Sequence, residues 1–567
     1  MLSRRSVVTI LIVALALVAA GCGNRNDEQQ TASRTRLTIL AEDVPTGLDY
    51  DGPAVGIPTS QTGMVNLMEG LLTYAPAGQN DEGVRLLDFT KYEGRLAESW
   101  DYDPATLTWT FHLRQGVVGC EGASFNADDV LYTFARAKSV SGPIPLGWFE
   151  ANTAGIDGFT PDVITDESKR ELGDEVTKVD DYTVKIRQSR PPSQLFLPVL
   201  AQWAGVLIFD KETMEANKTD KDPWSHEYTN NTNAPSFGPY CLKTWEKGSQ
   251  FVVTANPQYY RGAPAVSEIV YRKVPESANR VAALRSGDAD LVEHLTPKEF
   301  HALRDADGIE VSGVIGNETL LIHLNWKTKP FDDERVRQAF AHAIPYDEII
   351  ANGYAGQAKK WESQISSTYP GYHRPAKQYG TDPAAARELL AQAGFPDGRG
   401  LDRFGDALRL TYTAEKQSTL GPIATVIQAS LREVGFPVEL DPIPQTQFAD
   451  RLYTKHDLPL ALDDIEKAVP VDGGYALLIA HTTYGCCANN GNFADPRVDE
   501  LVKAANVETD QAKRSTLLAQ AQDILMERLS LLPIVEYKTQ WAYRDDVQGI
   551  TWHPENSLRW SDLRAGG

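Results

Sequence analysis

The sequence predicts an α/β protein with more than one lobe, and three observations support this prediction. Stretches in which apolar and polar residues alternate, typical of β-strands, are separated by segments with helical spacing of apolar residues. Residues 408–440 follow the order strand, helix, strand, which predicts a parallel or mixed sheet covered by helices. At 567 residues, the chain is also too long for one ordinary domain.

The first residues have the order of a bacterial lipoprotein signal. Two arginines precede an apolar run over residues 7–20, whose helix of about 21 Å is shorter than the roughly 30 Å hydrocarbon core of a membrane. Small residues then lead into Cys22, as in a lipobox, where the cysteine is acylated and becomes the new N-terminus. We expect residues 1–21 to be a signal peptide and the polar residues 22–35 to be a lipidated, flexible tether. An incidental cysteine behind an ordinary signal peptide is the alternative.

The composition excludes one large class of partners. Hydrophobic residues make up 42% of the chain and charged residues 23%, as in a globular protein. The 77 acidic residues outnumber the 55 basic ones, and the formal net charge of −22 would repel the phosphates of a nucleic acid. We therefore expect no nucleic-acid partner, and an extracytoplasmic protein that contacts the outer face of the cell membrane through its lipid alone.

Several elements can be placed individually. Large apolar and polar residues alternate over residues 109–114, which predicts a strand. Asn126 is expected to cap a helix, with Asp129 at the capping-box position. Another helix is expected to start at Asp382, with proline as its first residue, and to end at Gly394.

Toward the C-terminus, the spacing predicts three further elements and a long helix. Residues 408–412 and 438–440 are expected to be strands, joined by a helix whose apolar residues recur from 423 to 431 and which ends at Gly435. A helix from about residue 510 to 529 is expected to point its apolar residues inward. These inward residues are Leu517, Ala521, Ile524, Leu525 and Leu529.

The cysteines predict disulfides. With Cys22 lipidated, four cysteines remain, and an even number in an oxidising compartment allows three connectivities. A ring between adjacent cysteines would be strained, so we expect the two neighbours to have separate partners. The four residues are Cys120, Cys241, Cys486 and Cys487.

Motifs that carry enzymatic chemistry are missing from the sequence. It contains no G-x-S-x-G, no H-E-x-x-H, no P-loop and no G-x-G-x-x-G after a strand. His481 near Cys486 and Cys487 is a weak metal site, because disulfide-bonded cysteines supply no thiolate and one histidine is too few. We expect no enzymatic activity, no cofactor and no bound metal.

A series of short motifs identifies a family. The most specific is FHLRQGV at residues 111–117, followed by FNADDV at 125–130 and YTF at 132–134. Further motifs lie at 69–72, 96–100, 238–240, 256–262, 283–290, 330–339 and 382–396. In this order they resemble the bacterial extracellular solute-binding proteins of family 5, the peptide- and nickel-type binding proteins of ABC importers. The resemblance covers about residues 36 to 560.

The resemblance implies a three-lobed periplasmic-binding-protein-like fold (type II, cluster C), with a hinge and a ligand cleft between lobes. A discontinuous lobe lets the chain cross several times between two rigid bodies, so that the cleft closes without unfolding. The landmarks assign residues 36–65, 177–317 and 535–567 to lobe I, 66–176 to an appended lobe II, and 318–534 to lobe III.

The function implied by the resemblance is that of a substrate-binding lipoprotein of an ABC importer. It would capture a small solute, peptide-like in the first reading, by lobe closure and deliver it as a monomer to the permease and its ATPase subunits. One alternative keeps the fold and changes the solute to an oligosaccharide, an opine or a metal chelate. Another is a surface protein that senses, scaffolds or hydrolyses without transport.

Candidate ligand residues come from segments that the resemblance places at the cleft. A loop at residues 57–61 offers small polar groups, an aromatic wall follows the turn at 142–143, and the strand entering lobe III carries two polar residues. The candidates are Thr59, Ser60, Gln61, Trp148, Phe149, His323 and Asn325. The motif residues Trp109 and Phe111 are instead expected in the core.

Residues 460–477 depart from the family pattern. Peptide binders of the family resemble G-W-x-x-D-Y-x-D-P here, with an aspartate that pairs with the peptide amine. This chain lacks the Gly-Trp pair and has Ala468 at the place of that aspartate, whereas Asp463, Asp464 and Glu466 crowd earlier in the segment. An acidic cleft would favour a cationic or amine-bearing ligand, and a solvated loop is the alternative. The departure argues against ordinary peptide binding.

Replacing Cys22 with Ser should give a secreted protein without a lipid, because the hydroxyl does not replace the acylated thiol. Metabolic labelling with a fatty-acid analogue measures this, and Cys486→Ser, which keeps Cys22, is the matched control. Undiminished labelling of the Cys22→Ser protein would contradict the assignment.

Overall fold

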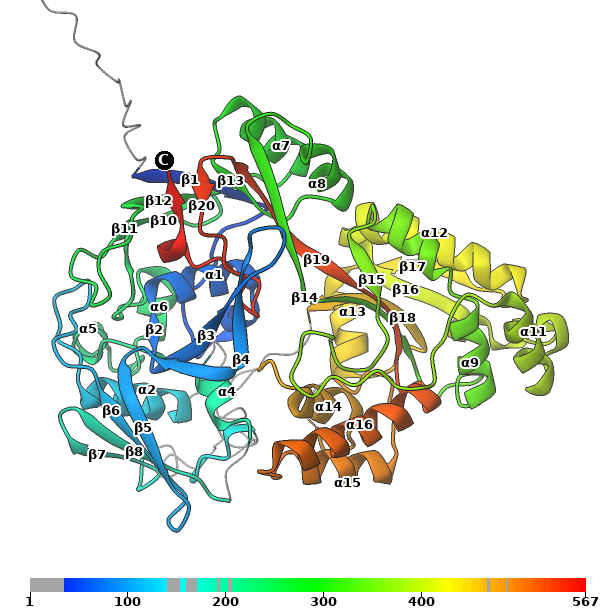
Figure 1. Cartoon of the computed structure of the whole chain (residues 1–567), viewed down its shortest axis with the longest axis horizontal. Helices are drawn as coiled ribbons and strands as arrows, with labels where there is room; N and C mark the ends of the chain where they lie inside the picture. The colour runs from blue at the N-terminus through cyan, green and yellow to red at the C-terminus, as the bar shows by residue number, and fades with distance from the viewer. Residues whose placement is uncertain are drawn as a thin grey trace, which may run out of the picture.

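The computed structural model describes most of the chain as two bodies that share one sheet. Two long strands run between these bodies (Figure 1): β14 (Ile309–Leu324) and β19 (Leu532–Arg544). We call the body that contains β1 the first body, and the body that contains α9 to α16 the second. The described residues are 35–139, 153–159, 171–190, 194–201, 206–466, 470–485 and 488–566.

An 11-stranded mixed sheet passes through both bodies, in the order β10-β11-β12-β1-β13-β19-β14-β18-β16-β17, with β15 paired to β19. β1 is parallel to β12 and β13, and β16 is parallel to β17 and β18. The first body contributes β1 (Arg36–Ala41), β10 (Tyr240–Glu246), β11 (Gln250–Ala255), β12 (Glu268–Lys273) and β13 (Leu291–Val292). The second contributes β15 (Ala358–Lys360), β16 (Arg409–Thr413), β17 (Glu439–Ile443) and β18 (Leu460–Glu466).

Strands β14 and β19 are antiparallel and belong to the cores of both bodies. Their register runs from Ile309 opposite Arg544 to Ile322 opposite Leu532. On β14, Val314 packs in the apolar core of the first body, whereas Ile322 packs in that of the second. The lobe boundaries expected after residues 317 and 534 fall inside these two strands.

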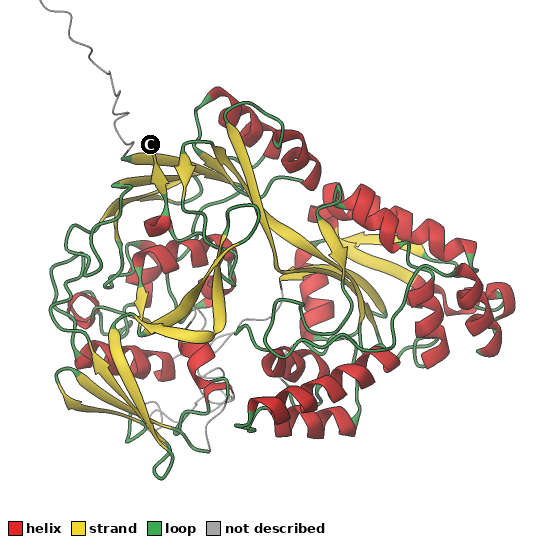
Figure 2. Ribbon diagram, viewed as in Figure 1, coloured by secondary structure: helices red, strands yellow, loops and turns green. Residues whose placement is uncertain are grey.

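Helices cover the sheet in both bodies (Figure 2). In the first body and its appendage they are α1 (Pro58–Leu67), α2 (Ala127–Ser139), α4 (Phe196–Leu200), α5 (Lys211–Ala216), α6 (His226–Asn231), α7 (Ser277–Ser286) and α8 (Pro297–Leu303). In the second body they are α9 (Glu334–His342), α10 (Tyr346–Glu348), α11 (Pro383–Gln392), α12 (Gln417–Glu433), α13 (Gln445–Ala449), α14 (Gly473–His481), α15 (Pro496–Ala505) and α16 (Gln511–Arg528). Within the described residues, none of these helices combines the length and apolarity needed to cross a membrane.

A separate four-stranded sheet with α2 forms an appendage on the first body. Its strands, in the order β5-β6-β8-β7, are β5 (Ala97–Asp103), β6 (Thr108–Leu113), β7 (Val176–Asp180) and β8 (Thr183–Arg187). Phe111 is fully buried there, as predicted. Trp109 is not: it packs at the margin of this core and is half-buried, so its assignment to the core interior is wrong. Smaller strand pairs are β2 (Glu69–Gly70) with β9 (Leu207–Ile208), β3 (Leu72–Gln79) with β4 (Arg85–Gly94), and β20 (Val547–Gln548) with β21 (Arg564–Ala565).

The predicted elements form for the expected local reasons. The side chain of Asn126 accepts from the backbone N–H of Asp128, and Asp129 accepts from that of Asn126, so α2 begins as expected. Asp382 accepts from the backbone of Ala385 at the start of α11. In α16, however, Leu518 is fully buried whereas Leu517 and Ile524 are half-buried, so the inward face is rotated from the predicted one.

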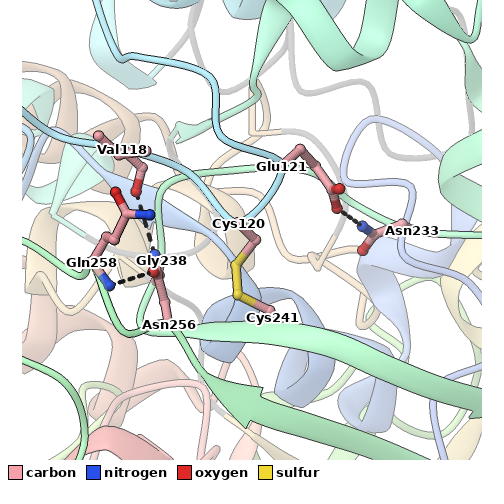
Figure 3. Close-up of a disulfide and its surroundings, with 8 residues drawn as sticks. All are labelled: Val118, Cys120, Glu121, Asn233, Gly238, Cys241, Asn256 and Gln258. Carbon is pink, nitrogen blue, oxygen red and sulfur yellow. Dashed lines mark hydrogen bonds between the residues drawn. A yellow bond between two sulfur atoms is a disulfide. The ribbon is translucent and has the colours of Figure 1, made fainter.

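A disulfide joins the appendage to the first body. Cys120 bonds to Cys241 on β10, and the side chain of Asn256 holds the same turn by donating to the carbonyl of Val118 at 3.3 Å (Figure 3). This pairing excludes both connectivities in which Cys486 and Cys487 have separate partners, so that expectation is wrong. The two neighbouring cysteines themselves lie outside the described residues.

Replacing both Cys120 and Cys241 with Ser should lower the free energy of unfolding by about 2–5 kcal/mol, because the bond closes a long loop in the unfolded chain. Urea unfolding of the soluble domain measures the change. Wild-type protein unfolded under reducing conditions should lose the same amount, whereas the reduced and oxidised double mutants should be alike. Equal stability of wild type and double mutant would contradict a structural role for the bond.

Candidate ligand-binding site

The two bodies contact each other along β4. Phe89 on this strand packs against the apolar clusters of the first body, the appendage and the helical part of the second body. Its ring meets Tyr74 and Trp552 edge to face, with centroids 5.0 and 5.5 Å apart. One aromatic side chain therefore lies where three cores come together.

A second contact between the bodies lies just before α4. Leu195 is 1% exposed and packs into the helical cluster of the second body, whereas its neighbour Phe196 packs into the appendage. The backbone N–H of Gln194 donates to the carbonyl of Asn506 at 3.3 Å, and Gln511 donates to the side chain of Gln194 at 2.9 Å. The bodies are therefore in direct contact on this side.

A cavity of about 650 Å³ lies between these contacts. This volume is within the range of about 300–1,000 Å³ of small-molecule sites. Its wall comes from β4, β5, β6 and α4 on one side and from α16 and neighbouring loops of the second body on the other. The lining residues are Phe89, Thr90, Tyr92, Tyr102, Trp109, Gln194, Leu197, Pro198, Pro370, Gly371, Asp472, Gln511, Arg514 and Ser515.

A carboxylate in the middle of β14 marks a second feature between the bodies. Glu318 accepts hydrogen bonds from the phenol of Tyr537 at 3.1 Å and from the amide of Asn556 at 2.8 Å. Tyr537 belongs to β19 and stacks on Tyr354, with ring centroids 4.7 Å apart. Asn556 comes from the segment between β20 and β21, so Glu318 ties the shared strands to the first body.

The charge around Glu318 is not balanced. Asp464 lies on the same face of the sheet, because Leu320 is its direct partner across β14 and β18, and it pairs with Lys416. Among the described residues, no lysine or arginine side chain lies within 4 Å of Glu318. Burial, and then the neighbouring Asp464, raise the pKa of the Glu318 carboxyl, and burial also raises the pKa of Asp464 despite Lys416. The ammonium group of Lys416 is therefore the one positive charge that partly compensates both the Asp464 and the Glu318 carboxyl groups among the described lysine and arginine side chains.

Comparison with known proteins identifies the family of this chain. Residues 91–484 match the family described as bacterial extracellular solute-binding proteins, family 5 Middle. The chain belongs to that family.

The relatives cover almost the whole of this family 5 protein. A dipeptide-binding protein of Pseudomonas aeruginosa is 27% identical over 534 residues, which are 92% of this chain and 93% of the relative. The DppA protein of Helicobacter pylori in complex with the peptide STSA has a TM-score of 0.75 and 24% identity, and the match covers 95% and 99% of the two chains. MoaA of A. tumefaciens R10 in complex with mannopinic acid has a TM-score of 0.74 and 25% identity, covering 94% and 100%. The predicted family and the periplasmic-binding-protein-like fold are confirmed.

In this family 5 protein, the pleat of β18 separates the predicted acidic residues. Asp463 points to the face opposite Asp464, where it accepts from the phenol of Tyr453 at 2.8 Å and lies 3.3 Å from the ring of His323. The backbone of Glu466 pairs with Glu318. The acidic residues therefore do not form one cluster, and Asp463 and His323 satisfy each other inside the second body.

The remaining described candidates make local contacts. Thr59, Ser60 and Gln61 lie in the first turns of α1, so the predicted loop is wrong. The hydroxyl of Ser60 accepts from the backbone of Thr46 at 3.2 Å, and Asn325 donates to the carbonyl of Leu458 at 3.3 Å. These buried polar groups hold chain segments together within one body.

Three further predictions concern the lipid anchor, the aromatic wall and the metal site. Cys22, Trp148 and Phe149 lie outside the described residues, so the predicted anchor and aromatic wall stay predictions. His481 hydrogen-bonds Ser530 at 2.9 Å. Within the described part of the chain, no group of three or more His, Cys, Asp or Glu side chains is arranged to hold a metal ion.

The sequence reading missed the residues that surround Asp464. Glu318, Lys416, Tyr537 and Asn556 come from four distant segments. One signal was present: Glu318 just precedes the apolar run of β14 at residues 320–322, and a carboxylate that becomes even partly buried there needs a reason. The partners carried no such signal, since their proximity arises from the fold.

Replacing Glu318 with Gln should stabilise the ligand-free protein at neutral and alkaline pH. The folded pKa of Glu318 lies above the unfolded value of about 4.3, so its stability contribution is full below that pH and is lost as the pH rises through the folded pKa. The amide removes this loss and still accepts from Asn556. Melting temperatures are measured from pH 4 to 8. The Glu318→Gln variant should melt at a higher temperature than the wild type at pH 8, and the difference should shrink toward pH 4. A difference that is constant or reversed would contradict the assignment.

Proposed function

We propose that this protein is the substrate-binding component of an ABC importer, which captures an amine-bearing, peptide-like solute between its two bodies. The observation that carries the proposal is the placement of a cavity and of an unbalanced carboxylate between bodies that share β14 and β19. Bending of two paired strands allows the bodies to close on a solute without breaking either core. Closure then presents a distinct surface to a membrane permease, which separate ATPase subunits drive.

The charge supports an amine-bearing solute. Glu318 and Asp464 have one ammonium group beside them, that of Lys416, so a positively charged ligand group would offset both the desolvation cost and the mutual repulsion of the carboxylates. The relatives named as dipeptide-binding proteins support a peptide-like solute, whose free amine has this charge. An opine is the second candidate, because a solved relative of similar fold holds mannopinic acid.

The setting of the protein belongs to the same proposal. We place the protein outside the cytoplasmic membrane, held by a lipid on Cys22 through the polar tether of residues 22–35. It acts as a monomer with lobe I at 36–65, 177–317 and 535–567, lobe II at 66–176 and lobe III at 318–534. The motif order at the N-terminus and the position of the shared strands support these assignments.

A thermal-shift screen of the soluble domain tests the proposal. Dipeptides, tripeptides, opines, oligosaccharides and nickel chelates are compared, and a true ligand at 100 times its Kd should stabilise the fold by about 2.7 kcal/mol. We expect shifts with amine-bearing peptides or opines. The Glu318→Gln variant should bind them at least tenfold more weakly, and N-acetylated peptides should bind poorly to the wild type. Shifts with oligosaccharides alone, or equal binding of acetylated and free peptides, would contradict the proposed solute class.

A further inference from the structure

Aromatic rings line one side of the cavity between the bodies. Tyr92, Tyr102 and Trp109 line it from three neighbouring strands, together with Phe89. Trp109 stacks on Phe196, with centroids 4.9 Å apart and planes 11° apart, and its indole N–H donates to Gln188 at 2.9 Å. The rings are therefore fixed before any ligand arrives, which lowers the entropy cost of contacting one.

The opposite wall carries charges that already satisfy each other. Asp472 and Arg514 are the charged lining residues, and their side chains, 7% and 6% exposed, pair at 2.6 Å. Asp472 also accepts from the backbone of Gly474 at 2.7 Å, and Arg514 donates to the carbonyl of Ala505 at 3.1 Å. Neither residue offers a free charge to a ligand, so the described lining of the cavity carries no net charge.

The neutral polar groups of the lining satisfy one another only in part. Gln194 and Gln511 bond to each other, and the hydroxyl of Ser515 donates to the carbonyl of Gln511 within α16. The phenol oxygen of Tyr102 is buried and has no hydrogen-bond partner among the described residues. A buried hydroxyl of this kind costs free energy unless a hydrogen-bonding group of a ligand or a water molecule lies beside it.

One chain segment connects this cavity to the shared strands. The hydroxyl of Ser366 lies 3.0 Å from the carbonyl oxygen of Gly316 on β14 and 2.7 Å from the carboxylate of Glu536 on β19, so it can donate to either. The same segment then passes through Pro370 and Gly371, which line the cavity. The segment that borders the cavity is therefore anchored to both shared strands.

We propose that this cavity is a subsite for an uncharged apolar or ring-bearing group of the captured solute. The inference rests on the proposed function and extends it: the carboxylates select the amine, and the aromatic cavity selects a side group. Because the two walls belong to different bodies, the side group is enclosed when the bodies close. Neutrality of the lining excludes a charged group there, since its desolvation would be uncompensated.

Two dipeptides of equal charge, Ala-Ala and Ala-Phe, test the subsite by calorimetry on the soluble domain. Wild type should bind Ala-Phe at least tenfold more tightly than Ala-Ala. Ser515→Trp, which fills the cavity from the exposed face of α16, should abolish that preference. Thr516→Trp, an exposed neighbour outside the lining, should keep it. No preference in wild type, or a preference kept by Ser515→Trp, would overturn the subsite.

A second arm separates failure of the subsite from failure of the proposed function. If wild type binds neither dipeptide, the dipeptide form of the proposed function fails, and saturation-transfer NMR with benzyl alcohol decides the cavity. A signal in wild type and Thr516→Trp that disappears in Ser515→Trp supports a ring-binding site, and equal signals in all three overturn it. Melting curves confirm folding, and Thr90→Trp fills the cavity from the opposite wall if Ser515→Trp does not fold.

Discussion

The antiparallel pairing of β14 with β19 is the constraint on which the rest of the structure depends. The two strands sit at the centre of the 11-stranded sheet and bury apolar side chains in both bodies. Neither body can complete its sheet without them, so the bodies cannot separate as independent domains. They can rotate relative to each other only as far as the paired strands bend, which is the motion that a closing cleft requires.

The same two strands explain where the charge lies. Glu318 is held at the middle of β14 by Tyr537 from β19 and by Asn556 from the first body. A carboxylate at this position costs solvation energy in the ligand-free protein, and strain or desolvation of this kind is retained where binding needs it. If position 318 served only to pack the core, an apolar residue there would stabilise the fold more than a carboxylate does.

The candidate site divides into two chemical zones. Around Glu318 and Asp464 the surroundings are acidic and served by one ammonium group. Around Trp109 and Tyr102 they are aromatic and neutral, with Asp472 and Arg514 paired. Together, a zone that binds a positive charge and a zone that binds an apolar group select a solute more narrowly than either zone alone. A charged group placed in the aromatic zone would be desolvated without a partner.

The sequence alone determined the family, the α/β class and the elements whose signals are local: the caps of α2 and α11 and the strand–helix–strand unit at β16, α12 and β17. Its reading of Asp463 and Asp464 as one acidic patch failed because a strand turns successive side chains to opposite faces, and the pairing with β14 decides which residues each of them meets. Likewise, the bond between Cys120 and Cys241 and the half-buried position of Trp109 at the cavity depend on segments brought together from afar. Local patterns specify elements, because their energies are local. Only the tertiary structure decided the site, because its residues become neighbours when the sheet closes around β14 and β19.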